Sequence, residues 1–126
     1  MKRHASPSSG FTLIEIMIVV AIIGLLATIA IPNFLHARRV AQMNACVSNL
    51  SQIAGAIQMW AMENNAGTGT PVTPANLTPL MGRGTGSIAS VYCPVDPTKT
   101  FVNSYNIADS ATKPTCKIVP ATHVIN

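Results

Sequence analysis

Residues 10–34 read GFTLIEIMIVVAIIGLLATIAIPNF, and this stretch decides the fold of the 126-residue chain. Residues 16–35 contain no charged side chain. Because a helix rises about 1.5 Å per residue, some twenty apolar residues suffice to cross a hydrocarbon core of roughly 30 Å. The stretch therefore predicts a membrane-spanning helix. A lone glycine, Gly10, and a carboxylate, Glu15, stand at its start, and a plain anchor requires neither.

The charges of the chain surround this apolar run. Lys2 and Arg3 precede it, Arg38 and Arg39 follow it, and the net charge is +4. The positive-inside tendency places the N-terminus in the cytoplasm, although the two arginines reduce the asymmetry. The other basic residues are scattered, and the chain has only one Trp, two Tyr and three Phe. We therefore expect no nucleic-acid-binding surface.

Three interpretations of the N-terminal segment compete: a plain anchor, a removable secretory signal, and a segment that uses Glu15. A signal cut after Ala30 is an alternative, because Thr28 and Ala30 form a small-x-small site. A carboxylate in a spanning helix costs about 2.5 to 3.5 kcal/mol at the centre and less near an end, so such residues usually have a partner.

The quoted stretch resembles the N-terminus of type IV pilins and of the pseudopilins of type II secretion. The resemblance implies that a prepilin peptidase cuts between Gly10 and Phe11 and that Phe11 is then N-methylated. It also implies that Glu15 meets the terminal amine of the next subunit during filament assembly. A buried charge without its partner costs several kcal/mol, so this pairing would select one register.

Gly24 and Pro32 are the marked positions inside the apolar run. Glycine costs about 1 kcal/mol relative to alanine in a helix, and proline removes a backbone donor. In the resembling family the stretch between two such residues bends or melts inside the filament. We therefore expect helix flexibility between Gly24 and Pro32.

An amphipathic helix is predicted to follow the apolar run. It should end near residues 64–67, where two asparagines and a glycine are residue types that commonly terminate helices. It would pack against a small head and extend the first segment into one long spine. The predicted organisation is a leader at 1–10, a membrane and assembly segment at 11–35, an amphipathic segment at 36–65 and a globular head at 66–126. The apolar stripe of the amphipathic segment consists of Val40, Met43, Val47, Leu50, Ile53, Ala54, Ile57 and Ala61.

The head is expected to be rich in loops. Thr73 and Pro74 predict the start of a helical turn. The GRGTG stretch at 82–86 lacks the GK[ST] ending and the strand–loop–helix context of a phosphate loop, so a mobile loop is expected. Runs at 88–92, 101–107 and 115–119 predict a three-stranded antiparallel sheet. The fold class is then α+β and pilin-like, with a long N-terminal helix packed on a small antiparallel sheet.

The chain has three cysteines, and one thiol must remain unpaired if a disulfide forms. Cys93 and Cys116 bracket two of the predicted strands, and a bond between them would add roughly 3 to 4 kcal/mol of stability on chain-entropy arguments. Disulfide-bounded C-terminal loops are found in pilins, so the resemblance favours this pair. Cys46 lies on the helix, either as a buried thiol or as the partner of one of the other two.

Metal and catalytic sites receive less support. Cys46, Cys93, Cys116 and His123 form an alternative zinc set, but no two of them have a short CxxC or HxxxH spacing. Oxygen ligands for calcium are available as well, although nothing resembles a calcium loop. No hydrolase motif is present. We therefore expect no metal, no other cofactor and no enzymatic activity. The oxygen ligands are Asp96, Asn103 and Asp109.

The resemblance implies a structural subunit of a type IV pilus or a type II secretion pseudopilus. Its partners would be related pilin subunits, the prepilin peptidase, an inner-membrane assembly platform and, before assembly, membrane lipid. It would cross the bacterial inner membrane once, with the head in the periplasm, and then enter a periplasmic or cell-surface filament. The alternative is a small interaction domain, anchored or secreted, that does not assemble.

Overall fold

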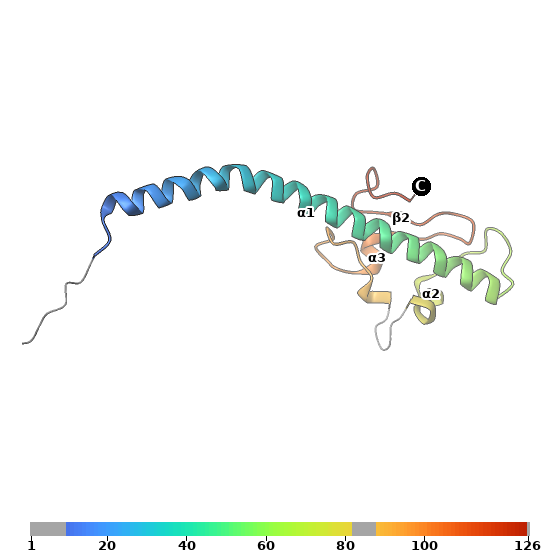
Figure 1. The fold of residues 1–126 in the computed structure, drawn as a ribbon. Coiled ribbons are helices and arrows are strands. Elements are labelled where there is room, and N and C mark those ends of the chain that lie inside the picture. Colours follow the sequence, from blue (N-terminus) through green and yellow to red (C-terminus); the bar gives the residue numbers. More distant parts are fainter. Residues whose placement is uncertain (1–9, 82–87, 126) are drawn as a thin grey trace, which may run out of the picture. The chain divides into compact units, whose positions relative to one another are not determined.

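The chain forms one long helix followed by short elements, and a computed structural model describes residues 10–81 and 88–125. The predicted leader, apart from Gly10, and the GRGTG stretch lie outside the described residues. The long helix and the small antiparallel sheet confirm the predicted α+β class (Figure 1). The elements are α1 (Leu13–Glu63), α2 (Pro74–Met81), the 3-10 turn η1 (Ile88–Ser90), α3 (Phe101–Ser104), β1 (Tyr105–Asn106) and β2 (Thr115–Cys116).

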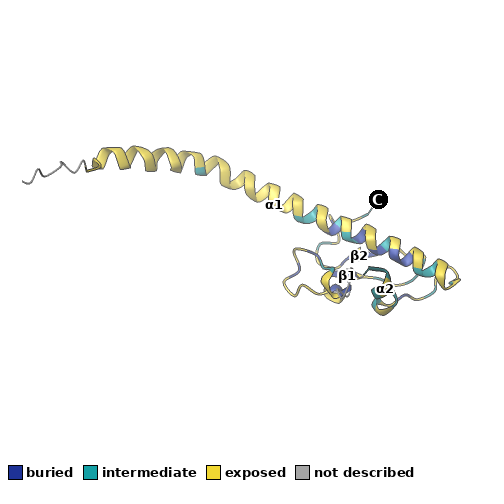
Figure 2. Ribbon diagram, turned by 60° about the horizontal axis from the view of Figure 1, so that its bottom comes forward, coloured by how far each residue is buried: buried dark blue, intermediate teal, exposed yellow. Residues whose placement is uncertain are grey.

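The chain divides into two units, Met1–Ala37 and Arg38–Asn126. In the first unit α1 exposes nearly every side chain, and only Ala27 is half-buried (Figure 2). By length and apolar composition this helix could cross a membrane. Gly24 and Pro32 both lie inside continuous helix. The predicted flexibility between them concerns the filament and remains a prediction.

The C-terminal end of α1 is fixed by its own sequence. The helix ends at Glu63, and Asn65 adopts a left-handed conformation with φ 47°. The Ala66 N–H donates to the Ala61 carbonyl at 2.8 Å, and the Asn65 N–H donates to the Met62 carbonyl at 3.4 Å. These two bonds form a Schellman motif, which satisfies carbonyls at the helix end. The predicted stop is confirmed.

The core of the second unit lies between the last part of α1 and the segments that follow it (Figure 2). Three residues of the predicted stripe, Leu50, Ile53 and Ile57, are buried, whereas Val40 is exposed. The buried face is therefore rotated from the predicted stripe toward Cys46 and Ala56. The rest of the core consists of Val72, Leu77, Ile88, Cys93, Phe101, Tyr105 and Cys116.

The predicted three-stranded sheet is wrong. The described residues form a two-stranded antiparallel sheet in which Tyr105 pairs with Cys116 and Asn106 with Thr115. The run at 88–92 instead contains η1, and the run at 101–107 opens with α3. Local hydrogen bonds explain the second change, because the Ser104 N–H donates to the Thr100 carbonyl at 3.1 Å and closes a helical turn.

The helical turn predicted at Thr73 and Pro74 is confirmed and extends over eight residues as α2. Pro74 occupies the first helical position, where its missing N–H leaves no intrahelical bond unmade. The Asn76 side-chain oxygen accepts the Thr73 N–H at 2.9 Å and also the Thr73 hydroxyl. Both bonds are donated by Thr73, and they correspond to the half of a capping box in which the third helical residue accepts the N–H of the cap.

Candidate functional site

Thr12 and Glu15 form a capping box at the start of α1. The Glu15 Oε2 atom accepts the Thr12 N–H at 3.2 Å and the Thr12 hydroxyl at 3.0 Å. In return the Thr12 hydroxyl oxygen accepts the Glu15 N–H at 3.3 Å. The box satisfies two donors that the first helical turn would otherwise leave unpaired, and it places a negative charge where the helix dipole favours one.

Gly10 and Phe11 lie immediately before this cap, in backbone that is neither helix nor strand. Phe11 is 84% exposed, and an added Cβ at Gly10 would meet no atom within 4 Å. The predicted cleavage position is therefore accessible in the described chain.

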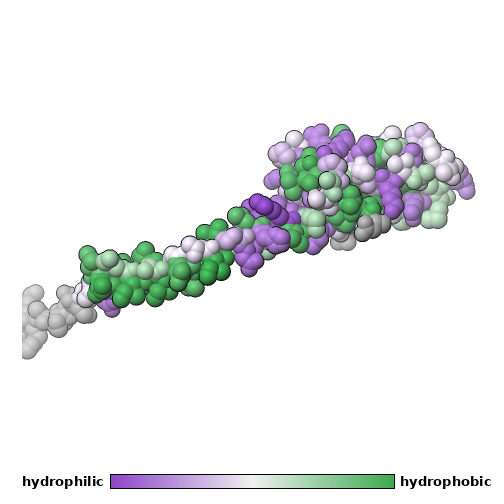
Figure 3. All heavy atoms as spheres, turned by 90° about the horizontal axis from the view of Figure 1, so that it is seen from above, coloured by the Kyte–Doolittle hydropathy of each residue, from purple (hydrophilic) through white to green (hydrophobic). Residues whose placement is uncertain are grey.

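The first part of α1 exposes large apolar side chains at nearly every position from Leu13 to Leu26, so they point in all directions around the helix. Figure 3 shows one face of this apolar surface. A helix that is apolar on all sides needs an apolar environment, either lipid or other helices. Within the described part of its unit, Glu15 is the only acidic side chain.

The second group of predicted site residues comes together in the head. Cys46 of α1, Cys93, Cys116 of β2 and His123 are all buried, and their ligand atoms lie within 4.8 Å of one another. The His123 Nδ1 atom lies 3.6 Å from the Cys93 sulfur and 3.8 Å from the Cys116 sulfur. Sequence spacing argued against such a cluster, yet the fold assembles it from four separate segments.

Burial favours the neutral forms of three members of this cluster. It raises the pKa of the Cys46 and Cys93 thiols, since a thiolate loses its hydration there. Burial also lowers the pKa of His123, so the neutral imidazole is favoured. All three cysteines are free thiols in the structure. The disulfide between Cys93 and Cys116 remains a prediction, and Cys46 lies beside both of its members.

A chain of hydrogen bonds supports the segment that carries Cys93. The Cys93 N–H donates to the Ser104 hydroxyl oxygen at 2.9 Å, and that hydroxyl donates to Asp96 at 2.7 Å. The Asp96 N–H closes a turn on the Cys93 carbonyl at 2.8 Å. The Ser104 hydroxyl is the main cause that lowers the pKa of Asp96 to about 2.

The oxygen ligands considered for calcium form turns instead. Asp96 accepts the Thr98 N–H and hydroxyl, and Asp109 accepts the N–H groups of Ala111 and Thr112 at 2.8 and 2.7 Å. The cysteine and histidine cluster is the one metal-capable group among the described residues.

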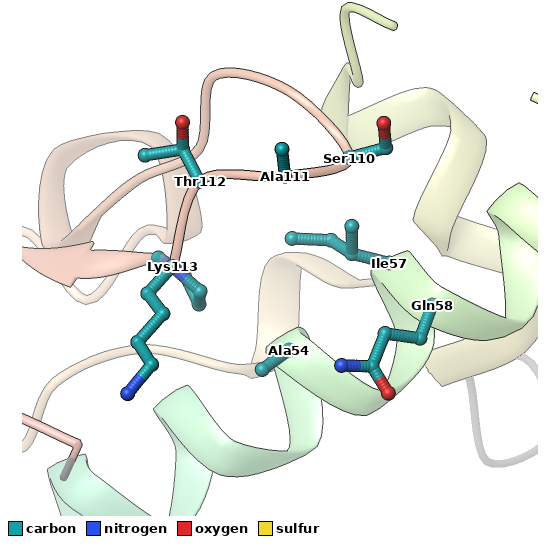
Figure 4. Close-up of a pocket in the computed structure, with 8 residues that line it drawn as sticks. Ala54, Ile57, Gln58, Ser110, Ala111, Thr112 and Lys113 are labelled. Carbon is teal, nitrogen blue, oxygen red and sulfur yellow. The ribbon is translucent and has the colours of Figure 1, made fainter. Parts of the chain in front are cut away.

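A shallow hollow lies between α1 and the loop at 110–114 (Figure 4). Ala54, Ile57 and Gln58 line it from the helix, and Lys113 lies on the opposite side. The described residues around it include no carboxylate, imidazole or thiol, so it offers no acid–base pair for catalysis.

Comparison with known proteins identifies the N-terminal segment. Residues 6–31 match the family model described as the prokaryotic N-terminal methylation motif. This segment is of the prepilin type. The chain is 33% identical over 79 residues to the type II secretion system core protein G of Aeromonas hydrophila. It is 39% identical over 80 residues to the type IV wide pilus major component PilA4 of Thermus thermophilus, and 47% over 53 residues to the type IV major pilin protein PilA of Myxococcus xanthus.

The matched stretches cover 63%, 56% and 42% of this chain and 53%, 61% and 24% of the respective relatives. The chain thus spans about half the length of the first two relatives. No solved structure matches it significantly. The predicted resemblance to type IV pilins and pseudopilins is confirmed, and the relatives are named as filament or secretion-system components.

Thr12 is a residue of the prepilin-type segment that was not predicted as a site residue. The spacing Thr-x-x-Glu is nevertheless the signature of a capping box. That signal predicts which residue holds the Glu15 carboxylate at the helix start.

Proposed function

We propose that the chain is a filament subunit of a type IV pilus or a type II secretion pseudopilus, made as a precursor and assembled through its N-terminal helix. The observation that carries the proposal is the methylation motif over residues 6–31, with Glu15 held at the start of the apolar first part of α1. The relatives support this class, because they include both a secretion core protein and major pilins.

The first step is cleavage between Gly10 and Phe11 by a prepilin peptidase, followed by N-methylation of Phe11. Exposure of both residues in non-helical backbone supports it, because a protease binds its substrate extended. The absence of a Cβ at Gly10 lets a peptidase approach the backbone closely. Cleavage removes the basic leader and creates a cationic amine on Phe11.

The second step is pairing of Glu15 with the Phe11 amine of a neighbouring subunit. The capping box uses the Thr12 amide and hydroxyl, neither of which is consumed by the cut. The mature chain therefore keeps the Glu15 carboxylate oriented. Its Oε2 atom already accepts two bonds, while Oε1 accepts none from any described residue, so it is available for the amine. Removal of one member of a buried ion pair costs about 3 to 5 kcal/mol, which disfavours wrong registers.

The apolar surface of residues 13–35 then has two successive environments. Membrane lipid covers it before assembly, and the helices of other subunits cover it in the filament. Lys2 and Arg3 favour a cytoplasmic N-terminus and hence a periplasmic head. An inner-membrane platform would extract the subunit.

The functional division of the chain is a leader at 1–10, an assembly segment at 11–35, an amphipathic segment at 36–65 and a head at 66–126. Gly24 and Pro32 allow local extension of the helix within the assembly segment.

The mass and N-terminal sequence of the chain recovered from membranes and from sheared surface material test the processing step. We expect a chain that starts at Phe11 and carries one additional methyl group. A chain that retains Met1 or begins at Ile31 would contradict the proposal. It would favour the alternative of an anchored or secreted domain.

Glu15→Ala tests assembly, and Glu63→Ala is the matched control because Glu63 lies exposed in the last turn of the same helix. We expect Glu15→Ala to enter the membrane but to be absent from filaments, while Glu63→Ala assembles normally. Equal incorporation of both variants would refute the pairing mechanism. Fibres made mainly of this chain in cells without a secretion system would assign it to a pilus.

A further inference from the structure

We propose that Cys46, Cys93, Cys116 and His123 bind one Zn²⁺ ion in the head. The four ligand atoms are three sulfurs and one imidazole nitrogen, and all lie within 4.8 Å of one another. A Cys₃His set is one of the established ligand sets of structural zinc sites, which are tetrahedral and closed to solvent. This site is independent of cleavage, of Glu15 and of filament assembly.

The distances fit a tetrahedron around zinc. With Zn–S bonds of about 2.3 Å and a Zn–N bond of about 2.05 Å, tetrahedral angles place sulfur and nitrogen about 3.6 Å apart. His123 Nδ1 lies 3.6 and 3.8 Å from the sulfurs of Cys93 and Cys116. The same geometry requires neighbouring sulfurs about 3.8 Å apart, which the limit of 4.8 Å accommodates with small movements.

Burial separates this cluster from a chance gathering of surface groups. The exposed fractions are 0% for Cys46 and Cys93, 1% for Cys116 and 5% for His123. Each ligand comes from a different segment: α1, the stretch after η1, β2 and the C-terminal stretch. A metal here would link all four segments, which is how a small domain with a limited core gains stability.

Neighbouring groups already orient two of the ligand-bearing segments. The backbone N–H of Cys93 donates to the Ser104 hydroxyl oxygen at 2.9 Å and fixes the backbone of that ligand. The His123 N–H donates to the Val119 carbonyl at 3.1 Å and fixes the backbone of the last ligand. These two backbone bonds fix the segments from which the Cys93 and His123 side chains extend.

The charge balance is explicit. Three thiols lose three protons to solvent and become thiolates, while neutral His123 binds through Nδ1 with its proton on Nε2. The bound Zn²⁺ with three thiolates carries a net charge of −1. The competing chemistry is a disulfide, in which two of the thiols lose two protons and two electrons to an external oxidant. That bond would leave the third sulfur and His123 without a shared role.

The test uses the full chain, reduced and purified in detergent, stripped with a chelator and titrated with Zn²⁺ or Co²⁺. We expect one equivalent of zinc. We also expect the cobalt form to show the intense visible bands of tetrahedral Co²⁺ and a thiolate-to-cobalt charge-transfer band. A chain that binds neither metal after reduction would overturn the proposal, as would recovery from its native compartment with two of the cysteines joined, recognised by a mass two units lower.

His123→Asn separates the metal from the disulfide, because it removes a metal ligand and leaves all three sulfurs. We expect it to lose zinc or to bind it at least tenfold more weakly, whereas His36→Asn, at an exposed position of α1, binds normally. Unchanged affinity and an unchanged cobalt spectrum in His123→Asn would refute the site. If that variant does not fold, the cobalt spectrum of the unaltered chain decides, since tetrahedral thiolate coordination needs several cysteines at one ion.

Discussion

Leu50→Ala should destabilise the head strongly. Leu50 is fully buried, with 0% exposure, and it lies one turn after Cys46 on the face of α1 that forms the core. The change removes three buried carbon groups, which is about 2.4 kcal/mol of transfer free energy at about 0.8 kcal/mol each. The cavity that remains adds to this, and buried Leu→Ala changes cost about 2 to 5 kcal/mol in total. We expect a loss of about 3 kcal/mol.

Trp60 provides the assay. It is the only tryptophan of the chain, and it packs, half-buried, against the core of the second unit. Its fluorescence therefore reports unfolding of the head and not of the apolar helix. For a unit of about 90 residues, 1 kcal/mol shifts Tm by roughly 4 to 8 °C, so the expected fall is about 12 to 24 °C. The full chain is melted in detergent with a reductant and a chelator, so that metal does not contribute.

Met62→Ala is the matched control, because Met62 lies on the same helix and is 71% exposed. A surface change of this kind stays within about 0.5 kcal/mol. If Leu50→Ala melts within the range of Met62→Ala, the last part of α1 does not form the core of the head, and the reasoning fails.

Three further predictions concern hydrogen bonds. Tyr105→Phe removes the hydroxyl that accepts a hydrogen bond from the Asn49 amide at 3.0 Å. We expect the free energy of unfolding to fall by about 1 kcal/mol in the same melting assay, and an unchanged Tm would contradict this prediction. Asp96 has a pKa of about 2 in the folded chain against an ordinary 3.8, so the folded state binds fewer protons than the unfolded state. Its contribution to stability is complete above about pH 5 and is lost as the pH falls from about 5 to below 2. Asp96→Asn should flatten that part of the Tm–pH curve, and an unchanged curve would contradict this. Thr12→Ala should weaken the first turn of α1 by about 1 kcal/mol and speed amide exchange there, whereas Thr28→Ala should leave exchange in that turn unchanged.

The long helix was predictable because its signals are local. The apolar run at 16–35 needs only its length to be recognised. The end of α1 can be predicted from Asn65 alone, because asparagine tolerates the left-handed conformation that it adopts there. The buried face was predicted less well, because Cys46 and Ala56 are small residues whose burial depends on the segments that cover them.

The head was predicted poorly because specific hydrogen bonds and long-range contacts, which residue patterns do not reveal, decide it. Apolar and β-branched residues at 101–107 favour a strand, but Asp96 and Ser104 bond to each other and the chain closes into α3 before the strand begins. The cysteine and histidine cluster has the same cause. Spacing rules detect ligands a few residues apart, whereas Cys46 is brought to Cys93 and Cys116 only by packing of α1 on the rest of the head.

The two chemistries available to the cysteines differ in what they hold together. A disulfide between Cys93 and Cys116 closes a loop that lies entirely after α1, and it adds no link between the helix and the head. A metal bound by Cys46, Cys93, Cys116 and His123 joins the helix itself to the segments that cover it. Only the second arrangement therefore links α1 to the head segments through bonds from their side chains.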